Sequence, residues 1–414
     1  MILWKKFNII IYEHAILTHY CEALYLGKSS IADFFKRTDT YLWLLTIAAV
    51  VYSFLLISSM QRAGDYNYLR SQIAAVLLGA GGALLIAGAD YRFILKKWYI
   101  AAAIGLILAL LVFLFGVNVS GTDDTAWIKL PGGFTVQPSE FIKICFIITF
   151  SKHLSYLNKK NRIQSFAGVL ALTVHAMIPM LLIHMQGDDG TVLIFGFIFL
   201  IMSYIAGVQL RYFAILGGML LVGIPVIWNF FLNDEHRNRF LALFDLDGNA
   251  MTNYGWQQFQ GKISMASGGL TGAGLFNGSR VEYGIVPEQE NDFIFTVAGE
   301  ELGFIGCIIL MGILFGITIR LIIDARNANE NDGRYLCTGV FATIAAQTII
   351  NLGMVLGFLP VIGITLPLFS AGGTSALSTM ICIGLVQSVC NHNDDDMDKA
   401  MLNRKSRNRA RIRM

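Results

Sequence analysis

Runs of apolar residues about 20 long recur between residues 41 and 390, and they leave few folds open to the chain. A helix needs about 20 apolar residues to cross the hydrocarbon core of a bilayer. Only 14% of the 414 residues are charged and 55% are hydrophobic, whereas about 25% of a soluble domain is charged. The sequence therefore predicts an all-α polytopic membrane protein with about ten transmembrane helices. Their approximate limits are 41–60, 70–88, 98–117, 138–154, 166–185, 191–207, 212–231, 291–318, 335–357 and 365–390.

Basic residues gather in alternate connections between these runs. With the N-terminus inside, most of the 31 Lys and Arg residues fall on the inner side, as the positive-inside rule requires. An even number of spans then places both termini in the cytoplasm. We expect a cytoplasmic N-terminal segment at 1–40, a ten-helix membrane domain at 41–390 and a basic cytoplasmic tail at 391–414. Within the membrane domain, residues 232–290 form one long extracytoplasmic loop.

One apolar run begins among acids and contains two more. Residues 286–306 start as a polar loop that reaches Asp292 and continue into a span that holds Glu300 and Glu301. At 1.5 Å per residue, Glu300 lies roughly 12 Å along the helix from Asp292. A carboxylate at that depth costs about 2.5 kcal/mol or more unless it faces a cavity or a partner. Asp292 fits either a helix N-cap or a general base beside an aromatic surface that raises its pKa.

Two further groups of polar residues lie in or near predicted spans. Glu140 and Lys143 are three residues apart, so they share a helix face and fit an internal ion pair, a cation lining a cavity for an anionic substrate, or both. We expect Asp188, at the outer end of the fifth span, to pair with Lys143 across helices. Asn351 and the residues around Ser370 interrupt the last apolar runs. They suit close helix packing or a polar surface that lines a groove.

Several common catalytic and metal-binding motifs are missing from the sequence. It has no HExxH, no GxSxG and no cluster of zinc ligands, and its six cysteines form no CxxC pair. The glycine-rich stretch at 267–279 does not follow a predicted strand, so a dinucleotide or P-loop site is not expected. The cysteines are interpreted as small buried hydrophobes.

Six motifs in order resemble those of one known family, the shape, elongation, division and sporulation (SEDS) family of RodA/FtsW-like proteins. The resemblance covers most of residues 40–390. It rests on Trp127, QPSEFIK at 137–143, QGDDGT at 186–191, SGGLTGAG at 267–274, VPEQENDFIF with GEELG at 286–303, and NLGMVLGFLPVIGITLPLFSAGGTS at 351–375.

The resemblance implies a peptidoglycan glycosyltransferase in the bacterial cytoplasmic membrane. Such a protein polymerises lipid II, an undecaprenyl-diphosphate-linked disaccharide pentapeptide, at the outer membrane face during cell elongation or division. It also implies that Asp292 is the catalytic residue, and that Glu140, Lys143 and Asp188 form a charged network required for activity.

The same resemblance implies partners, and the charge of the lipid II diphosphate calls for cations close by. The candidate cations for the diphosphate are Lys143, Arg239, Lys262 and Arg280, and Trp127 and Ser370 complete the substrate-binding set. Mg²⁺ or Mn²⁺ would suit the diphosphate, although no ligand set identifies a metal site. The expected partners are a class B penicillin-binding protein, proteins of the elongation or division complex, and membrane lipids that the basic tail can contact. Nucleic acid is not among them.

Two other functions remain open at this point. A lipid II flippase would also use intramembrane charges and a groove, but it would not need Asp292 as a base. A non-catalytic scaffold for the penicillin-binding protein would need neither a catalytic aspartate nor the intramembrane charges. The intact Asp292 and the Glu140–Lys143 pair therefore argue against a scaffold. Glycan synthesis by purified protein in detergent, where no flipping takes place, separates enzyme from flippase.

Overall fold

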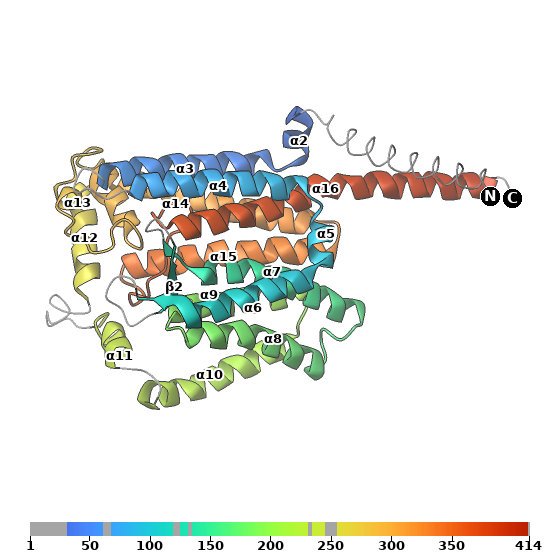
Figure 1. Cartoon of the computed structure of the whole chain (residues 1–414), viewed down its shortest axis with the longest axis horizontal. Helices are drawn as coiled ribbons and strands as arrows, with labels where there is room; N and C mark the ends of the chain where they lie inside the picture. The colour runs from blue at the N-terminus through green and yellow to red at the C-terminus, as the bar shows by residue number, and fades with distance from the viewer. Residues whose placement is uncertain are drawn as a thin grey trace, which may run out of the picture.

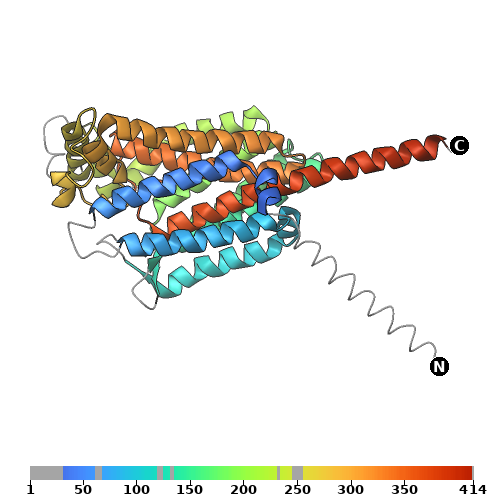
Figure 2. The ribbon, with the colours of Figure 1, turned by 90° about the horizontal axis from the view of Figure 1, so that it is seen from above.

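The structure, a computed structural model, describes residues 31–60, 68–118, 125–130, 135–230, 234–244 and 255–412. Its long helices lie side by side as one bundle (Figure 1), and the view turned by 90° shows the same alignment (Figure 2). These helices are α3 (Thr40–Met60), α4 (Tyr68–Gly88), α6 (Trp98–Phe115), α7 (Pro138–Lys159), α8 (Phe166–His184), α9 (Asp189–Ala206), α10 (Leu210–Phe230), α14 (Ile294–Asn327), α15 (Asn331–Val355) and α16 (Gly373–Ile412).

The predicted all-α polytopic membrane fold is confirmed. Nine of the described helices are long and apolar enough to cross a membrane, and large apolar side chains cover their outer surfaces. The exception among the long helices is α7, which carries Glu140, Lys143 and Lys152 and lies within the bundle. The expected spans overlap these ten helices, and most limits agree to within a few residues. The exceptions are α16, which begins eight residues later than expected, and the C-terminal ends of α14 and α16, which extend well beyond the expected limits.

Small residues allow α4 and α16 to approach each other closely. A Cβ on Gly384 of α16 would lie 2.6 Å from Ala83 Cα of α4, and one on Gly79 of α4 would lie 2.9 Å from Met380 Cβ. Larger residues at these positions would push α4 and α16 apart. This would weaken their association, because membrane helices associate through close packing rather than the hydrophobic effect.

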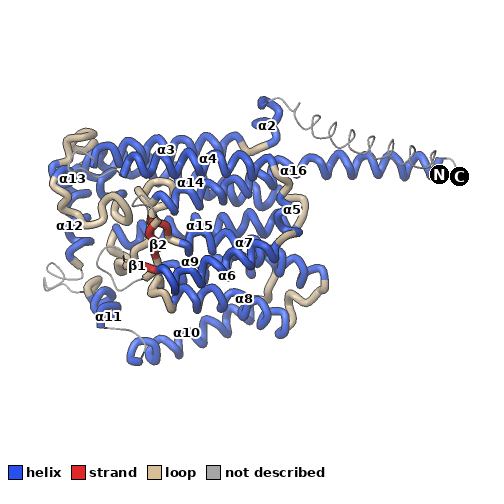
Figure 3. Tube along the Cα trace, viewed as in Figure 1, coloured by secondary structure: helices blue, strands red, loops and turns tan. Residues whose placement is uncertain are grey.

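Short elements cover one end of the bundle, where the sequence suggested only loops. The predicted loop at 232–290 contains α11 (Asp234–Leu241), α12 (Trp256–Gly268) and α13 (Ser279–Glu282). Residues between α6 and α7 form an antiparallel sheet of β1 (Gly116–Val117), β2 (Trp127–Lys129) and β3 (Thr135–Val136), with Val117 opposite Trp127 (Figure 3). The sheet lies at the same end as α12 and α13, so this end carries a structured cap.

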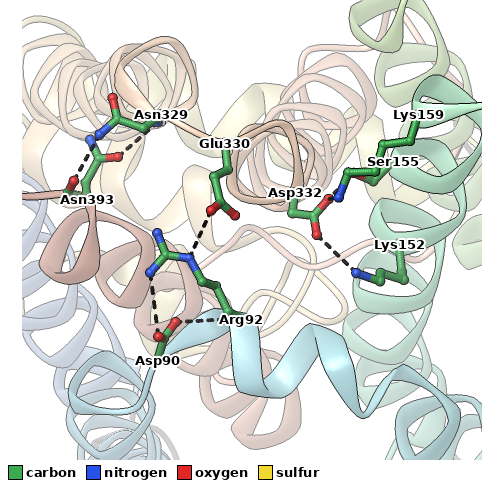
Figure 4. A network of polar contacts seen from close by, with 9 residues as sticks. All are labelled: Asp90, Arg92, Lys152, Ser155, Lys159, Asn329, Glu330, Asp332 and Asn393. Carbon is green, nitrogen blue, oxygen red and sulfur yellow. Dashed lines mark hydrogen bonds and ion pairs between the residues drawn. The ribbon is translucent and has the colours of Figure 1, made fainter. Parts of the chain in front are cut away.

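A polar network holds the opposite end together (Figure 4). There α5 (Tyr91–Lys96) presents Arg92, whose Nε lies 3.2 Å from Glu330 Oε1, and Lys152 Nζ lies 3.1 Å from Asp332 Oδ2. These pairs join α5 and α7 to the start of α15. The short helix α2 (Ile31–Arg37) lies at this end too (Figure 1).

Candidate active site

Asp292 lies two residues before α14, at the capped end of the bundle. The first residue flanking the helix is Phe293, which makes no side-chain capping bond. The N-cap interpretation of Asp292 is therefore wrong. Its side chain is half-buried, and no residue in the described part of the chain donates a hydrogen bond to its carboxylate. The carboxylate is thus left available to a ligand.

The environment of Asp292 favours its protonated form. Burial first, and then the nearby negative charges of Glu288 and Glu290, together raise the pKa of Asp292 from 3.8 to about 7. Desolvation and like charges both disfavour an ionised carboxyl. A carboxyl group with a pKa near 7 is suited to accept a proton at neutral pH.

The connection between α15 and α16, residues 356–372, passes next to this carboxylate; we call it the 356–372 segment. A Cβ on Gly363, whose φ is +76°, would lie 3.6 Å from Asp292 Oδ2. The Ser370 hydroxyl accepts a hydrogen bond from Leu366 N at 2.8 Å and donates to Asn291 O at 2.6 Å. Ser370 is 2% exposed, so the structure gives this predicted substrate contact a role in holding the segment.

Two of the predicted cations contact the same segment. Arg239 of α11 donates from Nη1 to Val361 O at 3.3 Å. Lys262 of α12 is exposed, and its ammonium lies against Gly357, where an added Cβ would be 2.2 Å from Nζ. Both positive charges therefore lie beside the segment that touches Asp292.

Glu140 and Lys143 form an ion pair inside the bundle. Lys143 Nζ lies 2.7 Å from Glu140 Oε1, and Ser378 of α16 donates to Glu140 Oε2 at 2.6 Å. The two charged residues are 5% and 2% exposed. This confirms the internal pair, while the buried ammonium does not reach a surface where it could contact a diphosphate.

The predicted pairing of Lys143 with Asp188 is wrong. Asp188 Oδ2 instead accepts hydrogen bonds from Gln137 Nε2 at 2.9 Å and Ser139 Oγ at 3.0 Å. Its other oxygen, Oδ1, accepts from Thr191 N at 3.0 Å and so caps α9. Asp188 therefore joins the start of α9 to the start of α7 through neutral partners.

The glycine-rich stretch at 267–279 packs against a break in α14. Gly303 has φ +68° and ψ −163°, which interrupts the helix. Across the break, Phe304 N donates to Gly269 O and Ala273 N donates to Glu300 O, at 2.9 and 3.0 Å. A Cβ on Gly272 would lie 2.1 Å from Glu301 O. Glycine is needed here because the two main chains touch.

Glu300 has main-chain partners rather than a cavity. It is 2% exposed, and its Oε1 accepts from the N–H groups of Arg280 and Val281 at the start of α13, at 2.7 and 3.3 Å. The Arg280 guanidinium donates from Nε to Ser264 Oγ of α12 at 2.8 Å. Arg280 therefore ties α13 to α12, so its guanidinium has a structural role in the cap.

Trp127 lies in β2 and is half-buried. The strand is held near the connection between α8 and α9, because Thr125 N donates to Gln186 O at 3.1 Å. Residues 119–124 and 131–134 on either side of it lie outside the described residues. A role for Trp127 in substrate binding stays a prediction.

The described residues contain no group of three or more His, Cys, Asp or Glu side chains placed to hold a metal ion. Gly363 and Ser378 were not predicted as site residues, although Gly363 lies beside the Asp292 carboxylate and Ser378 donates to Glu140. A serine inside an apolar span was the available signal for Ser378. Nothing in the local pattern marked Gly363.

Fold and site together define a polytopic helical membrane protein with a buried ion pair in its bundle and a half-buried carboxylate at one end. The profile of the FtsW/RodA/SpoVE family, described as cell cycle proteins, matches residues 36–395. The chain belongs to this family.

Relatives of known name agree with this assignment. The chain is 31% identical over 359 residues to the probable peptidoglycan glycosyltransferase FtsW of Trichlorobacter lovleyi, covering 85% of this chain and 92% of the relative. It is 30% identical over 358 residues to the peptidoglycan glycosyltransferase MrdB of Escherichia coli K12, covering 86% and 94%.

Solved structures show the same fold. The chain is similar to one in a peptidoglycan synthase complex described as coordinating polymerization and crosslinking, with a TM-score of 0.72, 25% identity and coverage of 86% and 98%. The rod shape determining protein RodA of Thermus thermophilus matches with a TM-score of 0.63, 26% identity and coverage of 86% and 97%.

Proposed function

We propose that this chain polymerises lipid II, with Asp292 as the general base. Its family membership makes it a peptidoglycan glycosyltransferase that acts in cell-wall synthesis. The observation that carries the assignment to Asp292 is its carboxylate, which is half-buried, receives no hydrogen bond from the described residues, and has a pKa raised to about 7.

In the proposed reaction, Asp292 takes the proton of the 4-hydroxyl group of the acceptor N-acetylglucosamine. The hydroxyl oxygen forms a bond to the anomeric carbon of the donor N-acetylmuramic acid as the bond to the diphosphate breaks. Undecaprenyl diphosphate leaves with the bonding electron pair, and the anomeric centre inverts. One base is sufficient because the leaving group is already a stable anion, whereas glycoside hydrolysis uses two carboxyl groups.

The charge that develops on the leaving diphosphate needs cations close by. Arg239 and Lys262 suit this role because both contact the 356–372 segment beside Asp292. Lys143 is not proposed for it, since its ammonium is buried against Glu140. We propose that any Mg²⁺ or Mn²⁺ ion is bound through oxygens of the substrate diphosphate.

The active end of the bundle faces the outside of the bacterial cytoplasmic membrane in this proposal. The Arg92 and Lys152 pairs of Figure 4 lie at the other end, as do the chain's basic connections. Positive charge next to spanning helices favours the cytoplasmic side. Asp292 then lies where the sugars of lipid II are, and the basic residues 391–414 lie in the cytoplasm.

We also propose a class B penicillin-binding protein as the partner that cross-links the strands. The similarity to a chain of a peptidoglycan synthase complex that coordinates polymerization and crosslinking supports this assignment. Proteins of an elongation or division complex would bind the same assembly.

The experiment is to supply purified chain, with and without its co-purified partner, with lipid II in detergent. Glycan strands are expected to form and to lengthen with time. Detergent removes the two sides that a flippase needs, so strand formation identifies a polymerase. Folded protein that binds lipid II and forms no strands in either preparation would favour the flippase.

A further inference from the structure

Asn351 is a polar side chain in the middle of an apolar helix. It lies in α15 and is 0% exposed. Its amide nitrogen Nδ2 donates to two main-chain carbonyls, Asp292 O at 2.8 Å and Ile364 O at 2.6 Å. A single amide group therefore joins the backbone of Asp292 to the 356–372 segment. These two bonds satisfy the buried Nδ2, whereas Oδ1 has no hydrogen-bond partner among the described residues.

The two carbonyls that precede Asp292 O are bound by the same region of the chain. Asn291 O accepts from the Ser370 hydroxyl at 2.6 Å, and Glu290 O accepts from Ala371 N at 2.8 Å. Three successive carbonyls thus accept hydrogen bonds from Asn351, Ser370 and Ala371. We call these three contacts the carbonyl clamp.

The clamp controls where the Asp292 carboxylate lies relative to the 356–372 segment. The segment brings Gly363 to the carboxylate and carries the contacts of Arg239 and Lys262. Asp292 lies before the first turn of α14 and has no capping bond to fix it there. The position of Asp292 relative to Arg239 and Lys262 therefore depends on the hydrogen bonds that its main chain makes.

We propose that Asn351 is a positioning residue for glycosyl transfer, which it serves by holding the Asp292 main chain against the 356–372 segment. The inference rests on the proposed role of Asp292 as the base. Asn351 touches neither substrate nor the carboxylate, so its removal lowers the rate of the chemical step and leaves lipid II binding unchanged. A misplacement of about 1 Å at a reacting group costs roughly a hundredfold in rate.

Gln258 provides a matched control. Its Nε2 also donates to two main-chain carbonyls, Met354 O at 2.8 Å and Leu359 O at 2.7 Å, and it is 6% exposed. It anchors the beginning of the same segment without contacting Asp292. Loss of either amide removes two hydrogen bonds to main-chain carbonyls, but only loss of Asn351 removes a bond to Asp292.

The test compares Asn351→Leu, Gln258→Met and Asp292→Asn with the unmodified protein in lipid II polymerisation. The two apolar replacements are close in volume to the originals. Asn351→Leu is expected to lower kcat about a hundredfold with KM changed less than about twofold, and Gln258→Met to lower kcat by only a few-fold. Asn351→Ser, which is too short to reach both carbonyls, carries the same expectation if the leucine variant does not fold.

The outcomes separate the two proposals. If a folded Asn351 variant keeps its kcat, or loses no more than Gln258→Met, while Asp292→Asn is inactive, the clamp is refuted and the base role stands. A rise in KM at constant kcat also refutes positioning, because it would place Asn351 in ground-state binding. Full activity of Asp292→Asn would overturn the base role itself, and the clamp with it.

Discussion

The pH dependence of polymerisation follows from the half-buried position of Asp292 beside two other acids. A pKa of about 7 leaves about a tenth of the carboxyl groups ionised at pH 6, half at pH 7 and nine-tenths at pH 8. If the ionised form is the base, kcat at pH 6 is about a tenth of kcat at pH 8. A carboxyl group at its ordinary value of 3.8 would be ionised throughout and give a flat profile.

The acids next to Asp292 make it possible to assign the midpoint of this pH profile to the Asp292 carboxyl group. Glu288 is the larger of the two charge contributions that raise the pKa of Asp292. Glu288→Gln removes the charge, and its amide oxygen can still accept from Asn291 Nδ2, as Glu288 Oε2 does at 2.7 Å. The midpoint is expected to move to lower pH, so the variant gains rate at pH 6 relative to pH 8.

The assay is kcat for glycan-strand formation at saturating lipid II from pH 5.5 to 8.5. Glu282→Gln is the control, because Glu282 is an exposed acid of α13 at the same end of the bundle and is not among the groups that raise the pKa of Asp292. A flat profile, or equal midpoint shifts in the two variants, would refute the assignment of the titrating group to Asp292.

Three other perturbations test the rest of the structure. Glu140→Gln leaves Lys143 buried without a counter-charge and should destabilise the bundle by about 3 kcal/mol, measured by thermal unfolding in detergent. The control Glu330→Gln, at a more exposed pair, should cost under about 1 kcal/mol. Equal losses of stability in the two variants would contradict a desolvated Glu140–Lys143 pair. Gly303→Ala places a Cβ 2.4 Å from a main-chain nitrogen at positive φ, and we expect a loss of folded yield; normal yield and activity would show that the break in α14 is not required. Arg239→Ala and Lys262→Ala should each lower kcat/KM for lipid II and weaken its dependence on salt, whereas unchanged values would place the diphosphate elsewhere.

The positions of the spanning helices were predictable because one property, apolar length, determines them. The expected limits 41–60 and 166–185 became α3 (Thr40–Met60) and α8 (Phe166–His184). The small sheet was not predictable, since its strands are two or three residues long and show no periodicity. The cap around α12 depends on a chain that folds back across a helix break, which the apolar pattern of residues 294–327 hides.

The residues of the site were predictable as types, and their partners were not. A carboxyl group before an apolar run marked Asp292, and the spacing of Glu140 and Lys143 predicted their pair. The expected bond between Lys143 and Asp188 failed because Gln137 and Ser139 lie closer to Asp188. Local spacing fixes neighbours on one helix, whereas contacts between helices depend on how the helices are rotated in the bundle.

The central claim is that the Asp292 carboxylate removes the acceptor proton. Its most direct test is kcat of folded, purified Asp292→Asn at pH 8 with saturating lipid II, because the unmodified base is then almost fully ionised. The amide has nearly the same size and cannot take a proton, so kcat should fall at least about a hundredfold, the smallest contribution typical of a general base. A kcat within twofold of the unmodified protein would contradict the claim.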